Sequence, residues 1–144
     1  MRRAELYYEW IKYYLSGNLT TQEFGEHFEK AFRNDPVCSG PGISLFAVDD
    51  LIEGYAFGNI TLEELTKMLY ERAEAAGLSP EECLTDPIFW ACQRLYEDWL
   101  ALDPDADSDS EFFITEETLL NRVRKIYFDF LDRYLEDTRK AQDA

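Results

Sequence analysis

Apolar residues recur every three or four positions along most of the chain, which is the period of an amphipathic α-helix. The first such stretch, "AELYYEWIKYYLSG", ends at a glycine and has one apolar face, formed by Leu6, Tyr7, Trp10, Ile11 and Tyr14. Alternating apolar and polar residues flanking Asn-Gly or Asp-Gly turns, which would indicate β-hairpins, are missing from the sequence. The pattern therefore predicts an all-α protein.

Two helix starts carry nearly the same signal. In "GNLTTQEF" Thr20 can cap a helix with Glu23 as its reciprocal partner, and in "GNITLEEL" Thr61 and Glu64 can do the same. The two stretches begin 41 positions apart, at residues 17 and 58. Either an ancestral helix pair was duplicated, or two helix starts converged on the same capping chemistry.

The remaining pattern predicts further helices. One begins near "ISLFAVDDLIEGYAFG", and another starts at Ser79 and is broken or kinked at Asp86-Pro87 before it continues through "IFWACQRLYEDWLAL". The last runs from about residue 115 to residue 140. With the first two capped segments and the N-terminal helix, this gives six helices, which we expect to form an antiparallel bundle with short connections.

Length and composition limit the possible partners. The chain has 144 residues, of which 46% are hydrophobic, enough for the core of a single domain spanning residues 1–144. Acidic residues outnumber basic ones 30 to 14, and the formal net charge is −16. Such a charge repels nucleic acid and anionic membranes, so neither is expected as a partner. A positively charged protein is the natural complement.

The negative charge is concentrated in one segment. Between Arg94 and Arg122 the chain has no basic residue but nine acidic ones: Glu97, Asp98, Asp103, Asp105, Asp107, Asp109, Glu111, Glu116 and Glu117. Like charges at this density repel one another and cost stability. Composition alone allows two interpretations of the segment. It is either a binding surface or a solvated loop without a partner, and the second would fit a structural scaffold protein.

Cysteine usage and the N-terminus predict a soluble, cytoplasmic protein without a cofactor. Three cysteines without CxxC spacing and the single histidine, His27, indicate neither a disulfide framework nor a zinc site. The first residues, "MRRAELYYEW", are too soon interrupted by charge for a secretory signal, and no apolar run approaches transmembrane length.

The acidic segment can also be compared with a calcium-binding EF-hand loop. Counted from Asp105, the carboxylates Asp105, Asp107, Asp109 and Glu116 occupy loop positions one, three, five and twelve. Ser110, however, stands at position six, where the sharp turn needs glycine, and no second loop exists to pair with the first. Calcium binding is therefore kept as an alternative.

Catalysis is not expected. The sequence contains no nucleophile elbow, no P-loop and no GxGxxG motif. The acidic segment is too rich in carboxylates to single out a general acid and base, and His27 lies on the predicted Phe24/Phe28 helix like an ordinary surface histidine. We therefore expect a protein that is not an enzyme.

The C-terminal half of the chain resembles the colicin D immunity protein family. The resemblance lies in "LDPDADSDSEFFITEETLLNRVRKIYFDFL", with its acidic-Pro-Asp-Ala-Asp run and its apolar stripe at Val123 and Ile126 around Arg124. Upstream, "GNITLEEL" and the "LSP" at residues 78–80 are similar to earlier helix starts of the family. The resemblance covers roughly residues 45 to 131, within the region 43–140, and leaves residues 1–42 as an N-terminal helical extension or repeat.

This resemblance implies a four-helix core, here with extra N-terminal helices, that inhibits a tRNA-cleaving toxin by placing acidic side chains where tRNA phosphates would lie. The matched acidic positions are Asp103, Asp105 and Asp107. To these we add Asp98, Asp109 and Glu111 because of their proximity and charge. The expected partner is thus a cognate basic nuclease toxin, either of the colicin type or delivered by cell contact.

Overall fold

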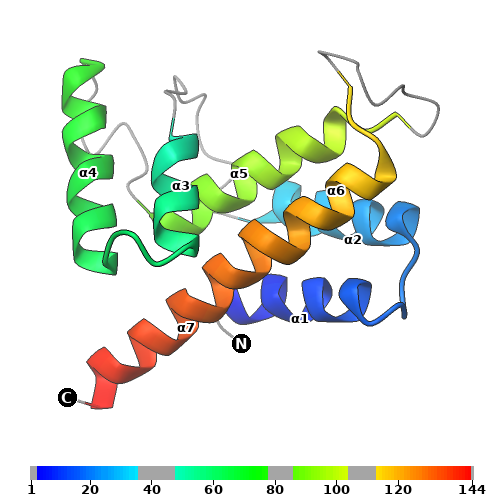
Figure 1. Ribbon diagram of the computed structural model, residues 1–144, viewed down its shortest axis with the longest axis horizontal. Coiled ribbons are helices and arrows are strands. Elements are labelled where there is room, and N and C mark those ends of the chain that lie inside the picture. Colours follow the sequence, from blue (N-terminus) through cyan, green and yellow to red (C-terminus); the bar gives the residue numbers. More distant parts are fainter. Residues whose placement is uncertain (1–2, 36–47, 78–85, 104–112, 144) are drawn as a thin grey trace.

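The computed structural model describes residues 3–35, 48–77, 86–103 and 113–143. Within these ranges the chain forms six helices, the last of them interrupted by a π-helical turn, and one isolated β-bridge but no strand (Figure 1). The predicted all-α helical bundle is therefore confirmed. None of the helices in these ranges is long and apolar enough to cross a membrane.

The first two helices, α1 (Arg3–Leu15) and α2 (Thr21–Asn34), form an antiparallel pair. Gly17 permits the turn between them, because its φ of +84° lies in the left-handed region. Thr20 caps α2 as predicted. Its hydroxyl oxygen accepts from the backbone N–H of Glu23 at 3.1 Å, and the Glu23 carboxylate accepts from the backbone N–H of Thr20 at 3.0 Å.

The next pair, α3 (Asp49–Ala56) and α4 (Leu62–Ala75), repeats this geometry. Gly58 has a φ of +82°, and Thr61 and Glu64 exchange the same two hydrogen bonds at 3.1 and 3.0 Å. The buried positions also correspond at the 41-residue spacing, as the pairs Tyr7/Val48, Ile11/Ile52, Tyr14/Tyr55, Phe24/Leu65, Phe28/Leu69 and Phe32/Ala73 show. This agreement in turn, cap and buried register favours duplication of a helix pair.

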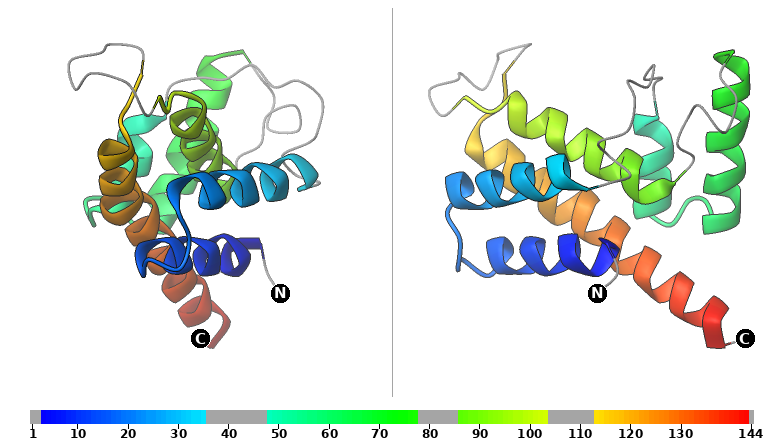
Figure 2. Two further views of the ribbon diagram at one scale, coloured as in Figure 1. Left: turned by 90° about the vertical axis from the view of Figure 1, so that its right-hand side faces the viewer. Right: turned by 180° about the vertical axis from the view of Figure 1, so that it is seen from behind.

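Both pairs pack against α5 (Pro87–Leu100) and the long C-terminal helix. The latter runs continuously through α6 (Glu116–Arg122), the π-helical η1 (Val123–Tyr127) and α7 (Phe128–Asp143). The first helix of each pair contacts α7 and the second helix of each pair contacts α5, while α3 also contacts both α5 and η1. Figure 2 shows α2 lying between α1 and α5. The two pairs thus share their main contacts with the last two helices, and the second pair adds those of α3 with α5 and η1.

All of these helices contribute to one apolar core. Its largest fully buried side chains are Trp90, Tyr7, Tyr55, Tyr127, Phe24 and Phe28. Burying one large apolar side chain stabilises a fold by about 1.5–3 kcal/mol. Because Tyr7, Phe24 and Phe28 come from α1 and α2, the extra N-terminal helices expected from the sequence complete this core.

Two local features refine the predicted helix boundaries. At the predicted break, Asp86 caps α5 by accepting from the Ile88 N–H at 2.9 Å, and Pro87 occupies the first helical position, where its missing N–H costs nothing. The π-helical turn was not predicted from the sequence. Within it Val123, Ile126 and Tyr127 are buried, and their spacing of three and four positions continues the apolar face of the helix.

Some expected features lie outside the described residues. They include the helix start at Ser79 and two of the cysteines, Cys38 and Cys83. The third, Cys92, is buried on α5.

Candidate functional site

The two ends of the acidic segment are joined by backbone hydrogen bonds. The N–H of Asp103 donates to the carbonyl of Ile114 at 3.0 Å, and the N–H of Ile114 donates to the carbonyl of Ala101 at 2.9 Å. These bonds form a parallel β-bridge between Leu102 and Ile114, whose side chains pack against the core. Residues 101–103 and Ile114 are therefore held together between the end of α5 and the start of α6.

Only part of the predicted toxin-binding set can be located. Asp103 lies at the base of the segment and is partly exposed. Asp105, Asp107, Asp109 and Glu111 lie outside the described residues. The expected binding role of these five residues stays a prediction.

Asp98 has a different position from the one expected. Its residue is only 8% exposed, and its carboxylate accepts hydrogen bonds from Arg122 Nη1 at 2.6 Å and from the Tyr127 hydroxyl. Helix α5 turns this side chain toward the C-terminal helix, so proximity in sequence to the acidic run does not place it on the same surface. Asp98 is a structural ion-pair residue that ties the end of α5 to α6 and η1.

The surroundings of Asp98 form a partly buried polar network. Burial, followed by the charge and hydrogen bond of Asp98, raises the pKa of Tyr127 well above its ordinary value, so its hydroxyl remains a donor. Nearby, Arg94 pairs with Asp49 at 3.4 Å and with Glu53 at 3.1 Å, while its Nη1 is buried without a hydrogen-bond partner. The two arginines that flank the acidic segment in sequence, Arg94 and Arg122, are thus both paired with carboxylates from other helices.

Exposed acidic side chains remain around the base of the segment. Glu97 is exposed on the last turns of α5, and Glu116 and Glu117 are exposed on the first turn of α6. Thr115 caps α6 by accepting from the Thr118 N–H at 3.1 Å. Carboxylates in the first turn favour a helix because they face its partial positive charge. Glu116 and Glu117 therefore stabilise α6 as well as adding to the negative surface.

The calcium alternative rests on Asp105, Asp107, Asp109 and Glu116. Of these only Glu116 is described, as an exposed residue at the start of α6. Among the described residues, no group of three or more histidine, cysteine, aspartate or glutamate side chains is arranged to hold a metal ion. The calcium hypothesis therefore stays untested.

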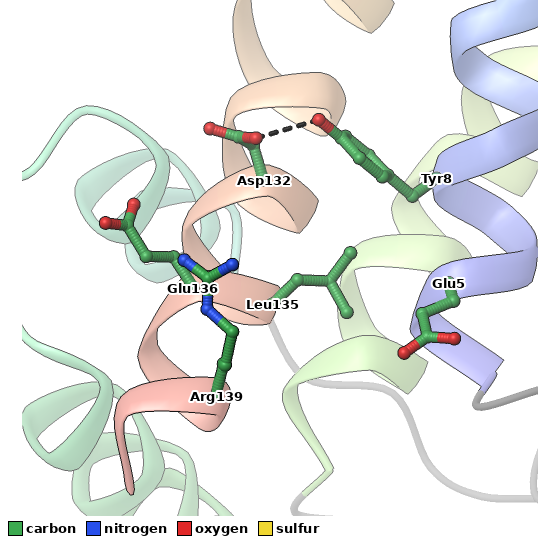
Figure 3. A pocket seen from close by; sticks show the side chains of 6 residues that line it. All are labelled: Glu5, Tyr8, Asp132, Leu135, Glu136 and Arg139. Carbon is green, nitrogen blue, oxygen red and sulfur yellow. Dashed lines mark hydrogen bonds between the residues drawn. The ribbon is translucent and has the colours of Figure 1, made fainter. Parts of the chain in front are cut away.

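A separate cleft of about 320 Å³ opens between α1 and α7 (Figure 3). It is lined by Glu5, Tyr8, Asp132, Leu135, Glu136 and Arg139. The Tyr8 hydroxyl donates to Asp132 at 2.8 Å, and burial together with this carboxylate raises the pKa of Tyr8 to about 12. No sequence signal indicated the cleft, because α1 and α7 stand at opposite ends of the chain.

Comparison of the chain with models of known protein families, with curated proteins and with solved structures found no match. The resemblance to colicin D immunity proteins therefore rests on a few short stretches of sequence, chiefly the acidic run and the apolar stripe around Arg124.

His27 has a structural environment that agrees with the expectation of an ordinary surface histidine. It is exposed on α2, and its ring stacks on Trp10 of α1, with ring centroids 4.6 Å apart. The stack joins the outer faces of the first helix pair.

Proposed function

We propose that the protein is an immunity protein that binds and inhibits a cognate basic nuclease toxin in the bacterial cytoplasm. In this proposal the carboxylates of residues 103–117 occupy the cleft in which the toxin would otherwise hold RNA. The resemblance to the colicin D immunity family suggests a tRNA-cleaving toxin. Delivery as a colicin and delivery by cell contact are both compatible with the proposal.

The observation that carries the proposal is the closed base of the acidic segment. The paired hydrogen bonds between residues 101–103 and Ile114 fix where the segment begins and ends. A binding surface whose ends are already held in place loses less conformational freedom when a partner docks. A charge run that serves solubility alone has no need of such an anchor.

The distribution of positive charge supports a basic partner. Arg94 and Arg122 are engaged with Asp49, Glu53 and Asp98, and the sequence between these arginines has no other basic residue. The segment therefore keeps a large negative charge that its own side chains cannot neutralise. Electrostatic complementarity with a positive partner steers encounter and can raise association rates toward about 10⁸ M⁻¹s⁻¹ at low salt.

Protection of cells that express the toxin tests the proposal. We expect Asp105→Asn combined with Asp107→Asn to abolish protection against the nuclease encoded beside this gene. A control that removes equal charge, Glu63→Gln combined with Glu71→Gln, changes exposed residues on α4, which lies at the other end of the molecule from the α5–α6 connection (Figure 1). This control should protect fully.

The affinity of the same variants for the purified, catalytically inactivated nuclease domain can also be measured. Neutralising a carboxylate that is buried against a positive partner should cost on the order of 2–5 kcal/mol of binding free energy. If both variant pairs bind with the affinity of the unaltered protein, the acidic segment is not the site. If the unaltered protein does not bind this nuclease at all, the proposed function is wrong.

A further inference from the structure

Two large apolar side chains are exposed at the base of the acidic segment. Leu100, on the last turn of α5, is 58% exposed, and Phe113, immediately before the β-bridge, is 49% exposed. Both values are high for side chains whose burial would be favourable by about 1.5–3 kcal/mol each. Their position, one on either side of the segment's closed base, calls for a physical explanation.

Local geometry explains why each of these two residues is exposed. Side chains of consecutive residues in extended backbone point to opposite sides. Because Leu102 and Ile114 of the bridge pack on the core, Phe113 is directed away from it. On α5, Leu100 follows Glu97 by one helical turn, so the two share an exposed face, while Asp98 faces inward.

The surroundings of this apolar pair are acidic. Glu97 is exposed beside Leu100 on α5, and Glu116 and Glu117 are exposed just after Phe113. A membrane surface or a nucleic acid would be repelled by these carboxylates. The ligand that matches apolar side chains within a negative rim is a protein surface with an apolar depression surrounded by lysine and arginine.

We propose that Leu100 and Phe113 are the apolar anchors of the docking surface and insert into an apolar depression beside the basic cleft of the partner. This inference rests on the proposed function, because it takes the partner to be the basic nuclease. Binding energy in protein interfaces is concentrated in a few residues near the centre, where aromatic side chains are enriched, and these are surrounded by a polar rim. The exposed carboxylates at the rim then govern the rate of association, and the two anchors, together with any carboxylate buried against the partner, govern the rate of dissociation.

The test uses the full-length protein and the inactivated nuclease domain encoded beside its gene. We expect Phe113→Ser and Leu100→Ser each to raise Kd by roughly ten- to a hundredfold, mainly through faster dissociation. The ratio to the unaltered protein should be the same at 50 mM and 500 mM NaCl, because an apolar contact is not screened by salt. Asp103→Asn should instead raise Kd mainly at the lower salt concentration.

The matched control is Phe57→Ser, which removes an equally exposed phenylalanine, 54% exposed, from the turn after α3. It should leave Kd unchanged within twofold. Thermal unfolding of each variant checks that the fold is retained, and Leu100→Ser gives an independent answer if Phe113→Ser unfolds. Hydrogen exchange gives a test without mutation, since binding of the unaltered protein should add protection at residues 100–103 and 113–115 relative to the free protein.

The outcomes separate the two proposals. Weakened binding by Asp105→Asn with Asp107→Asn, but unchanged Kd for both serine variants and no added protection at residues 100–103 on binding, would overturn the anchor role and leave the proposed function standing. If the unaltered protein does not bind the nuclease, both proposals fall together. A salt-independent loss of affinity in the serine variants alone would support the anchors and reject the carboxylates as the main determinant.

Discussion

Asp98 and Asp103 lie close together in the chain but have opposite environments. Asp98 is buried between Arg122 and Tyr127, whereas Asp103 is partly exposed at the base of the acidic segment. The difference arises because Asp98 is on the inward face of α5 and Asp103 follows the helix end. Because the Asp98 carboxylate already accepts hydrogen bonds from Arg122 and Tyr127, it stabilises the fold and is not exposed to a partner.

Substitution of these two residues should therefore have opposite effects. Asp98→Ala leaves the buried Tyr127 hydroxyl and the partly buried Arg122 without their acceptor, and we expect the free energy of unfolding to fall by about 1–3 kcal/mol. Urea denaturation measures this loss. Asp103→Ala should leave stability nearly unchanged but weaken binding of the nuclease. Unchanged stability with reduced affinity for Asp98→Ala would show that this residue is part of the binding surface after all.

Two helical glycines provide a second residue-scale test. An ideal Cβ at Gly25 of α2 would lie 2.1 Å from the Trp99 ring of α5, so α2 and α5 approach closely only because this position lacks a side chain. Gly25→Ala should destabilise the protein by about 1–3 kcal/mol through overpacking.

The control is Gly54→Ala in α3, where a Cβ would meet Ile60 at an ordinary contact distance of 3.7 Å. Here the higher helix propensity of alanine should dominate and stabilise the protein by about 0.5–1 kcal/mol. Thermal or urea unfolding of the two variants should thus give changes of opposite sign. Equal changes would mean that the α2–α5 contact is looser than described.

At the scale of the elements, the capping boxes at the start of α2 and α4 are chemically equivalent. Thr20→Ala and Thr61→Ala each remove an acceptor from a helix start, and each should cost about 0.5–2 kcal/mol. Urea denaturation should give costs that agree within the error of the two measurements, as expected for a duplicated helix pair. A negligible cost at one site alone would contradict the equivalence.

The cap of α2 also predicts a dependence on pH. The backbone and hydroxyl of Thr20 lower the pKa of Glu23 below its ordinary value of 4.5 in the folded protein. Because the folded state prefers the carboxylate, this stabilisation is present above the unfolded pKa and is lost as the pH falls through the folded pKa. Glu23→Gln retains a capping side chain without titrating. It should make stability fall less steeply with pH below about 4.5, as measured by urea denaturation at several pH values.

Features that depend on nearby residues could be predicted from the sequence, and features that depend on helix packing could not. The caps at Thr20 and Thr61 involve residues only three positions apart, and the structure confirms both. The inward position of Asp98 depends on how α5 is rotated against η1, which periodicity does not specify. The cleft at Tyr8 and Asp132 is formed by helices from opposite ends of the chain. The sequence around Leu102 and Ile114 has no pattern that distinguishes a β-bridge from a loop.

At the scale of the whole molecule, a net charge of −16 opposes compaction. Screening by salt should therefore raise the thermal midpoint, by roughly a few degrees between 50 and 500 mM NaCl. Calorimetry of thermal unfolding measures this shift. Calcium chloride at equal ionic strength should give a comparable shift, because screening does not require a specific site.

The comparison of the two salts also tests the calcium alternative. A stabilisation by calcium well beyond that of sodium, lost on Glu116→Gln, would indicate a specific site at the acidic segment. If the segment binds a basic protein and no calcium, Glu116→Gln leaves the effect of either salt unchanged.

The central claim is that the acidic surface takes the place of RNA in the cleft of a basic nuclease. The mode of inhibition tests it most directly, with the nuclease encoded beside this gene assayed against tRNA at several concentrations of substrate and protein. We expect competitive inhibition, in which the apparent inhibition constant rises linearly with tRNA concentration and the maximal rate is unchanged. Inhibition that lowers the maximal rate and leaves the KM for tRNA unaltered would contradict the claim.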